Sequence, residues 1–99
     1  MKNKAAIEKL ILDIINILDS VGEINWKNAF LSHYNRILSA ANENDYKQAI
    51  RDVMGMYGGM GSFSDVVLYS QNRICVKETR KLDKLRKKLY SLVTEVITG

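Results

Sequence analysis

The glycine-rich stretch at residues 56–65 limits the possible folds of this chain more than any other feature. It reads Met-Tyr-Gly-Gly-Met-Gly-Ser-Phe-Ser-Asp and holds three of the six glycines within four residues. The segments on both sides carry apolar residues at three- and four-residue steps, which is the spacing of amphipathic helices. The stretch is therefore either a tight joint between helices or a recognition loop, and the sequence leaves both interpretations open.

Length and composition favour one small helical domain. The 99 residues can bury a modest core, and we expect a single helical domain over residues 1–99. Proline is absent, so no helix is interrupted by its ring. The apolar share of 46% is ordinary for a globular protein, which fits a chain that needs no disulfide or metal to fold.

Two amphipathic helices are predicted in the first half of the chain. A wide apolar stripe predicts the first over about residues 3–20, with Gly22 as the left-handed residue that ends it. A more aromatic stripe predicts the second over about residues 26–41, with Asn25 as its N-cap. The aromatic stripe either packs into the core or forms a partner groove around Trp26.

The third predicted helix leads into the glycine-rich stretch. Asn44 is its expected N-cap, and apolar residues continue at helical steps as far as Tyr57. Gly58 suits the left-handed residue that ends such a helix. Ser62 and Asp65 have the spacing of a variant capping box, so they predict a short new helix directly after the glycines.

The remaining residues predict one long closing helix. The short helix has its apolar body at residues 66–69, and a loop follows at residues 70–73. The apolar patch at residues 74–76 has extended character, but a lone strand lacks a partner. The last helix is expected over about residues 77–97. The predicted fold is therefore all-α, a compact single-domain bundle of four main helices plus one short helix after the glycine-rich turn.

The positive charge of the chain is concentrated in its last third. Residues 1–65 carry seven Lys/Arg and eight Asp/Glu, a balance of −1, whereas residues 66–99 carry eight and three, a balance of +5. A basic helix surface is typical of nucleic-acid binding, although a solvated charged surface is commoner. The basic side chains predicted to face solvent are Lys77, Arg80, Lys81, Lys84, Arg86, Lys87 and Lys88.

The sequence gives no support for an enzyme, a metal site or a cofactor. Cys75 and His33 are the only residues of their kinds, so no Cys/His ligand set exists. The glycines do not form the phosphate-binding G-x-x-x-x-G-K-[ST] pattern. We therefore expect no catalytic residues, no metal ligands and no cofactor.

The hydropathy of the chain predicts a cytoplasmic protein without a membrane span. Charged residues interrupt the first apolar run, as in an amphipathic helix rather than a signal peptide. No apolar stretch approaches the roughly 18 residues that a span needs.

The motif Tyr-Gly-Gly-Met-Gly-Ser-Phe-Ser-Asp at residues 57–65 resembles the core of a family of small uncharacterised bacterial proteins. Members carry Y-G-G-M-G-S-F-N-D, so Ser64 stands where the family usually has Asn. Trp26 resembles a tryptophan of the preceding helix in that family, and residues 82–90 resemble its closing L-x-x-L-R-x-x-x-Y helix. The resemblance implies a fold and a focal site in an immunity-like protein, but it implies no reaction.

A non-enzymatic protein-binding module is the function that these observations favour. We expect it to neutralise or regulate a bacterial or phage protein, as immunity proteins, antitoxins and inhibitors do. Methionine and aromatic residues are favoured interface anchors, although Met60 and Phe63 could instead pack between helices. Nucleic-acid binding through residues 77–88 is the alternative. The predicted partner-binding residues are Tyr57, Gly59, Met60, Ser62, Phe63 and Asp65.

Overall fold

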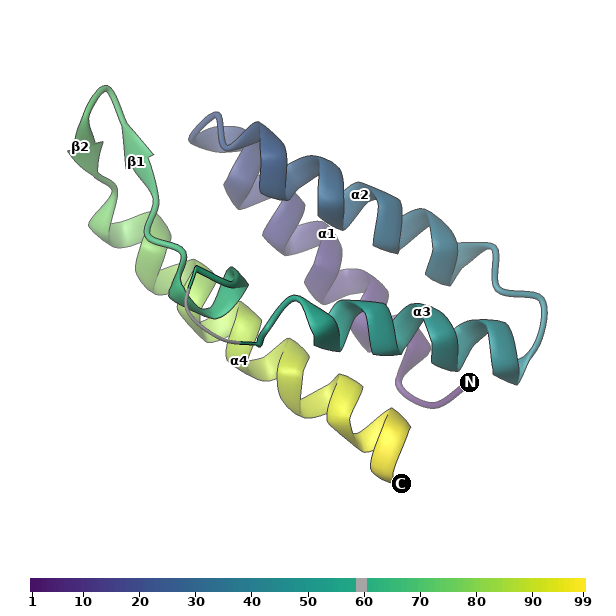
Figure 1. The fold of residues 1–99 in the computed structure, drawn as a ribbon. Helices are drawn as coiled ribbons and strands as arrows, with labels where there is room; N and C mark the ends of the chain where they lie inside the picture. The colour runs from purple at the N-terminus through teal and green to yellow at the C-terminus, as the bar shows by residue number, and fades with distance from the viewer. Residues whose placement is uncertain (59–60) are drawn as a thin grey trace.

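Four helices and one small hairpin make up the computed structural model, which describes residues 1–58 and 61–99 (Figure 1). The mostly all-α prediction is confirmed, but the predicted short helix after the glycines is replaced by a single 3-10 turn at Phe63–Asp65. In chain order the elements are α1 (Lys4–Ser20), α2 (Ile24–Leu38), α3 (Glu43–Gly55), β1 (Tyr69–Ser70), β2 (Arg73–Ile74) and α4 (Val76–Thr98).

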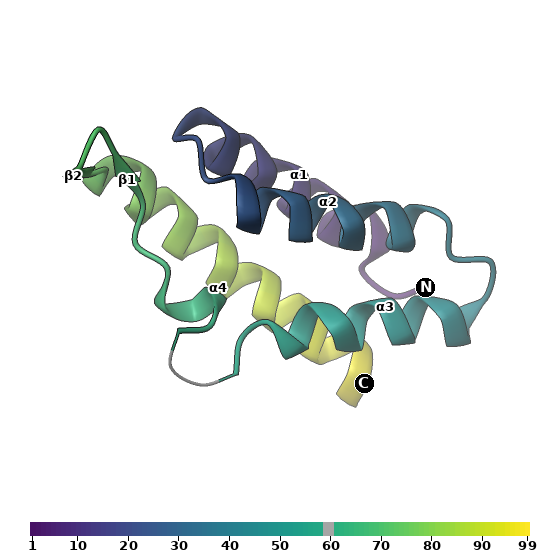
Figure 2. The same ribbon diagram turned by 45° about the horizontal axis from the view of Figure 1, so that its top comes forward.

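The helices form an elongated bundle measuring 43 × 22 × 20 Å. Helix α1 packs against both α2 and α4, and α3 packs against α4 and α2. This arrangement explains the wide apolar stripe of α1, because a helix with two neighbours must bury more than one side. Both termini lie at one end of the bundle, and the hairpin lies at the other end beside the turn from α1 to α2 (Figures 1 and 2).

The turn between α1 and α2 is set by Gly22, as predicted. Gly22 has a φ of 73°, and its N–H donates to the Asp19 carbonyl at 3.1 Å. The Glu23 N–H donates to the Leu18 carbonyl at 2.9 Å, which completes a Schellman motif. Helix α2 then begins at once, at Ile24, so the prediction of Asn25 as its N-cap was wrong.

Helix α3 begins one residue after Asn42. The Asn42 side chain accepts a hydrogen bond from the Asp45 N–H at 2.9 Å, so Asn42 and not Asn44 is the N-cap. The prediction was wrong by two residues because two asparagines stood close together. With the cap at Asn42, Glu43 and Asp45 both lie in the first turn, where the helix dipole stabilises negative charge.

The described part of the glycine-rich stretch is a closed loop rather than a helix start. Helix α3 ends at Gly55, and the Phe63 N–H donates to the Met56 carbonyl at 2.8 Å. Gly61, with a φ of 76°, takes the left-handed conformation that we had predicted for Gly58. The Ser62 side chain makes no capping hydrogen bond, whereas Asp65 accepts one from the Gly61 N–H at 3.2 Å.

The predicted body of the short helix is extended instead. Val66 has a φ of −65° and a ψ of 125°, and the Leu68 N–H donates to Thr79 Oγ1 of α4 at 3.1 Å. Branched side chains at Val66 and Val67 favour this extended backbone over a helix. Residues 66–68 therefore lead directly into strand β1.

The apolar patch at residues 74–76 has a partner after all. Strand β1 pairs with β2 in antiparallel register, Tyr69 opposite Ile74 and Ser70 opposite Arg73. The turn residues Gln71 and Asn72 have φ values of 52° and 63°, which fit a type I′ turn. The prediction of a loop at residues 70–73 missed this hairpin, because Gln-Asn is a weaker signal for such a turn than Asn-Gly.

Helix α4 spans Val76–Thr98, close to the predicted bounds. Its buried residues are Leu82, Arg86, Leu89, Val93 and Val96. Within residues 1–58 and 61–99, none of the helices combines the length and the hydropathy needed to cross a membrane.

Candidate functional site

Phe63 is the centre of an aromatic cluster that joins the glycine-rich stretch to the bundle. Its side chain has no exposed surface, and its ring centroid lies 4.6 Å from that of Phe30. Trp26 and Tyr57 complete the cluster at 5.3 and 5.7 Å. Of the two interpretations of Phe63, the structure therefore supports packing between helices. Its side chain does not reach the surface, where a partner could contact it.

Arg86 holds the 3-10 turn against α4. Its guanidinium Nη1 donates to the Phe63 and Val66 carbonyls at 3.1 and 2.8 Å, and its Nε donates to Asp83 Oδ1 at 3.1 Å. The prediction that Arg86 faces solvent was therefore wrong, because its side chain is only 9% exposed. The physical reason is the turn itself. Within the turn the Phe63 carbonyl accepts only a 3.3 Å hydrogen bond from the Val66 N–H, and one arginine supplies further donors to both the Phe63 and Val66 carbonyls.

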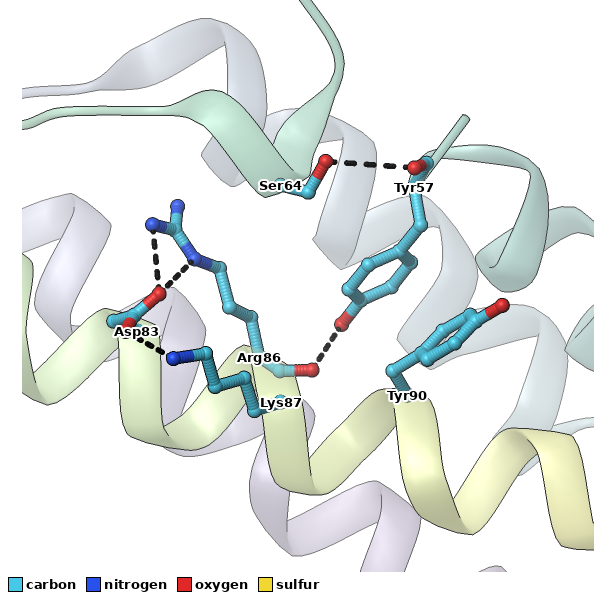
Figure 3. A pocket seen from close by; sticks show the side chains of 6 residues that line it. All are labelled: Tyr57, Ser64, Asp83, Arg86, Lys87 and Tyr90. Carbon is cyan, nitrogen blue, oxygen red and sulfur yellow. Dashed lines mark hydrogen bonds and ion pairs between the residues drawn. The ribbon is translucent and has the colours of Figure 1, made fainter. Parts of the chain in front are cut away.

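A hollow of about 350 Å³ opens between this turn and α4, and we call it the tyrosine hollow (Figure 3). The Tyr57 hydroxyl donates to the Arg86 carbonyl at 2.8 Å, and burial raises the pKa of Tyr57. The Tyr90 ring lies 4.9 Å from the Tyr57 ring, and Tyr90 is exposed. The hollow is lined by Tyr57, Ser64, Asp83, Arg86, Lys87 and Tyr90.

The charges at the floor of the tyrosine hollow are already paired. Asp83 accepts a hydrogen bond from Lys87 Nζ at 2.9 Å and forms an ion pair with Arg86 at 3.0 Å. The Lys87 hydrogen bond, assisted by Arg86, lowers the pKa of Asp83. Both cations are thus engaged by one carboxylate, and the remaining surface of the hollow is mainly apolar.

The predicted partner-binding residues that the structure describes do not line one common hollow. Tyr57 lines the tyrosine hollow, whereas Ser62 and Asp65 line a second hollow of about 280 Å³ beside Trp26. The two hollows share no residue. The predicted residues Gly59 and Met60 lie outside the residues that the structure describes.

The other basic residues of α4 are exposed, in contrast to Arg86. Helical spacing places Val76, Arg80 and Lys87 on one side of α4, with Lys84 beside them. A hollow of about 560 Å³ runs along this side, between Thr79 and Lys87. The exposed basic side chains are Lys77, Arg80, Lys81, Lys84, Lys87 and Lys88.

The hairpin carries an exposed apolar surface that sequence reasoning missed. The Cys75 N–H donates to the Leu68 carbonyl at 2.8 Å, so the pairing register continues past the strands. Alternation then places Leu68 and Cys75 on the inner side, where Leu68 is 1% exposed. The outer side consists of Val67, Tyr69, Ile74 and Val76, which are 43, 58, 55 and 53% exposed, and we call it the hairpin face.

A sequence signal for this face did exist. Three apolar residues on each side of a four-residue polar segment, at 67–69 and 74–76, are the pattern of a short hairpin. The outer positions of such a hairpin should be polar if they face only water. Here all four are apolar.

The described part of the chain contains no cluster of three or more His, Cys, Asp or Glu side chains that could hold a metal ion. His33 packs edge-on against Phe30 at 6.4 Å, and burial lowers its pKa despite the opposing effect of Asp52.

Comparison with known proteins identifies a family without an assigned role. A family model described as a domain of unknown function (DUF6966) matches residues 19–76, which is more than half of the chain. The chain belongs to this family. The DUF6966 match begins at the end of α1 and ends where α4 begins, so it contains the whole hairpin face and the glycine-rich stretch. It does not contain the basic side of α4. No curated protein and no solved structure matches the chain.

Proposed function

We propose that this chain is a non-enzymatic protein-binding module that neutralises or regulates another bacterial or phage protein. The observation that carries the proposal is the hairpin face. Scattered exposed apolar residues are normal in soluble proteins, but contiguous ones mark interaction surfaces. In the described residues, five of the nine exposed large apolar side chains belong to the hairpin face or to Ile24 at the start of α2, all at the same end of the bundle.

The construction of the hairpin supports a binding role over a structural one. Its inner side, with Leu68 and Cys75, already attaches it to the core, and the Leu68 N–H is held by Thr79. The outer side therefore lies outside the core of the monomer, with each of its four side chains about half exposed. Covering four half-exposed apolar side chains would contribute about 3–5 kcal/mol before the costs of association are subtracted.

One of the two hollows beside the glycine-rich stretch extends this surface. Val67 belongs both to the hairpin face and to the hollow lined by Ser62 and Asp65. The sequence-predicted residues Ser62 and Asp65 thus border the apolar surface and would supply polar groups at its rim. Interfaces commonly combine an apolar centre with such a polar rim.

Substituting the hairpin face should abolish partner capture without unfolding the protein. The test variant is Tyr69→Thr with Ile74→Thr, because threonine keeps the strand propensity while removing the apolar surface. Crosslinking pull-downs from the native host, with and without phage infection, should recover a defined protein with the wild type and lose it with the variant. Melting curves should remain close together, since both side chains are exposed.

The matched control removes two exposed apolar residues elsewhere, Leu12→Gln and Leu38→Gln. It should capture the same protein as the wild type. If the hairpin variant captures an unchanged set of proteins, the hairpin face is not the binding surface and the proposal fails.

Nucleic-acid binding remains the second candidate, on the observation that six basic side chains of α4 are exposed. If the chain is a protein-binding module, we expect it to bind duplex DNA and single-stranded RNA only weakly. The triple variant Lys84→Glu, Lys87→Glu and Lys88→Glu should then bind them no differently from the wild type. Fluorescence anisotropy across a salt series checks this expectation. A steep salt dependence that the triple variant loses, and that Lys2→Glu, Lys47→Glu and Arg51→Glu retain, would favour the nucleic-acid candidate instead.

A further inference from the structure

We propose that the partner segment bound by this chain is acidic, and that it lies along α4 from the hairpin face to the tyrosine hollow. This inference rests on the proposed function and names the chemistry of the partner. It is carried by two cations of α4 that form no ion pair within the described residues and that lie one and two turns beyond Val76, the last residue of the hairpin face.

The hairpin face continues into a basic side of α4. Val76 is both the last member of the hairpin face and the first residue of α4. Arg80 lies one turn further along the same side, and Lys84 lies one turn after Arg80. We call Arg80, Lys84 and Lys87 the α4 stripe. The hollow of about 560 Å³ along this side is lined by Thr79, Arg80, Asp83, Lys84, Arg86 and Lys87.

Ion pairing divides the cations of this hollow into two groups. Asp83 pairs with Arg86 and Lys87, at 3.0 and 2.9 Å. Over residues 1–58 and 61–99, neither Arg80 nor Lys84 forms an ion pair. These two exposed side chains are therefore available to carboxylates of another chain, and their sign matches the +5 balance of residues 66–99.

The far end of the α4 stripe is the tyrosine hollow, where Tyr90 exposes its ring beside Tyr57. Val76 and Tyr90 are 14 positions apart, which corresponds to roughly 21 Å along a helix. A partner helix of four turns, or a shorter extended segment, would span this length. It would place apolar side chains on the hairpin face, carboxylates over Arg80 and Lys84, and an aromatic or aliphatic side chain against Tyr90.

Charge favours this occupant over a second copy of the chain. A symmetric dimer built on the hairpin face would bring the α4 stripes of both copies toward the same interface, where like charges repel. An acidic segment gains attraction at the same positions. Its binding should consequently weaken as salt is added, because exposed charge pairs are screened.

The test uses the full chain as bait for a phage-displayed library of random 16-residue peptides. Enriched sequences should carry net negative charge and two or more large apolar residues. One enriched peptide, labelled with fluorescein, is then titrated by anisotropy. Affinity should fall about tenfold or more when its acidic residues become Gln and Asn, and by a similar factor with Arg80→Glu and Lys84→Glu in the protein.

Two control variants separate the parts of the proposal. Lys47→Glu with Arg51→Glu changes the net charge equally on α3, and it should leave the affinity nearly unchanged. Tyr69→Thr with Ile74→Thr should weaken the same peptide. Melting curves of all variants show that each one folds.

The outcomes distinguish failure of this inference from failure of the proposed function. Enriched peptides without acidic bias that still need Tyr69 and Ile74 overturn the acidic partner and leave the protein-binding function standing. The inference is overturned if no peptide is enriched. It is also overturned if the enriched peptides bind equally well to Arg80→Glu with Lys84→Glu and to Tyr69→Thr with Ile74→Thr. A concentration-dependent dimer in sedimentation velocity that Tyr69→Thr and Ile74→Thr abolish would assign the face to a second copy and also overturn it.

Discussion

Replacing Phe63 with alanine should lower the free energy of unfolding by about 3–5 kcal/mol, the usual cost of emptying a buried aromatic site. Phe63 has no exposed surface, and its ring touches those of Trp26, Phe30 and Tyr57. The space left behind would lie at the junction of α2, α4 and the glycine-rich stretch, which cannot all collapse together. A domain of this size has only about 5–15 kcal/mol of stability in total, so the loss would be a large part of it.

Urea denaturation followed by circular dichroism measures this effect. Phe63→Leu keeps most of the volume and should cost less than Phe63→Ala, which keeps the experiment informative if the alanine variant is largely unfolded. Val67→Ala, four residues away but exposed, is the matched control and should change stability by no more than about 0.5 kcal/mol. A wild-type midpoint for Phe63→Ala would mean that Phe63 is not a core residue.

Replacing Arg86 with leucine should cost about 2–4 kcal/mol, mainly because the Val66 carbonyl loses its arginine donor and the Phe63 carbonyl keeps only the 3.3 Å hydrogen bond from the Val66 N–H. Arg86 supplies the hydrogen bonds to the Phe63 and Val66 carbonyls and pairs with Asp83. Asp83 is 39% exposed and keeps Lys87, so its share of the loss is small. The leucine side chain replaces the apolar part of the arginine but cannot donate hydrogen bonds to the carbonyls of the turn.

Arg80→Leu is the matched control, since it removes an exposed arginine from the same helix. It should leave the denaturation midpoint nearly unchanged. Arg86→Lys should fall between the two, because one ammonium group cannot reproduce the planar fork of a guanidinium. Equal effects of Arg86→Leu and Arg80→Leu would contradict the anchoring role that the hydrogen bonds indicate.

The local sequence predicted which segments form helices, but it predicted the first residue of each helix less accurately. The apolar stripes identified all four helices, and Gly22 ended α1 where a left-handed residue was expected. The starts of α2 and α3 were misplaced by two residues each. Several residues near each helix start could serve as the N-cap. Which of them does so depends on the conformation of the preceding turn.

The hairpin and the buried arginine were harder to predict. Residues 74–76 were interpreted as a lone strand because the Gln71-Asn72 turn that pairs them with the preceding apolar residues is only a weak hairpin signal. Arg86 sits among lysines in a basic run, and arginine is usually exposed, although its position falls on the apolar stripe between Leu82 and Leu89. Its burial depends on two carbonyls that lie 23 and 20 residues earlier in the chain.

The sequence by itself determined a proline-free helical chain, its Gly22 turn and the position of its positive charge, because these follow from local composition and period. Only the tertiary structure decided which residues remain exposed. It buried Phe63 and Arg86, divided the predicted site between two hollows, and left Val67, Tyr69, Ile74 and Val76 uncovered. The reason is physical: exposure is a property of how distant segments pack, and the hairpin face exists because Leu68 and Cys75 on its other side were taken by the core.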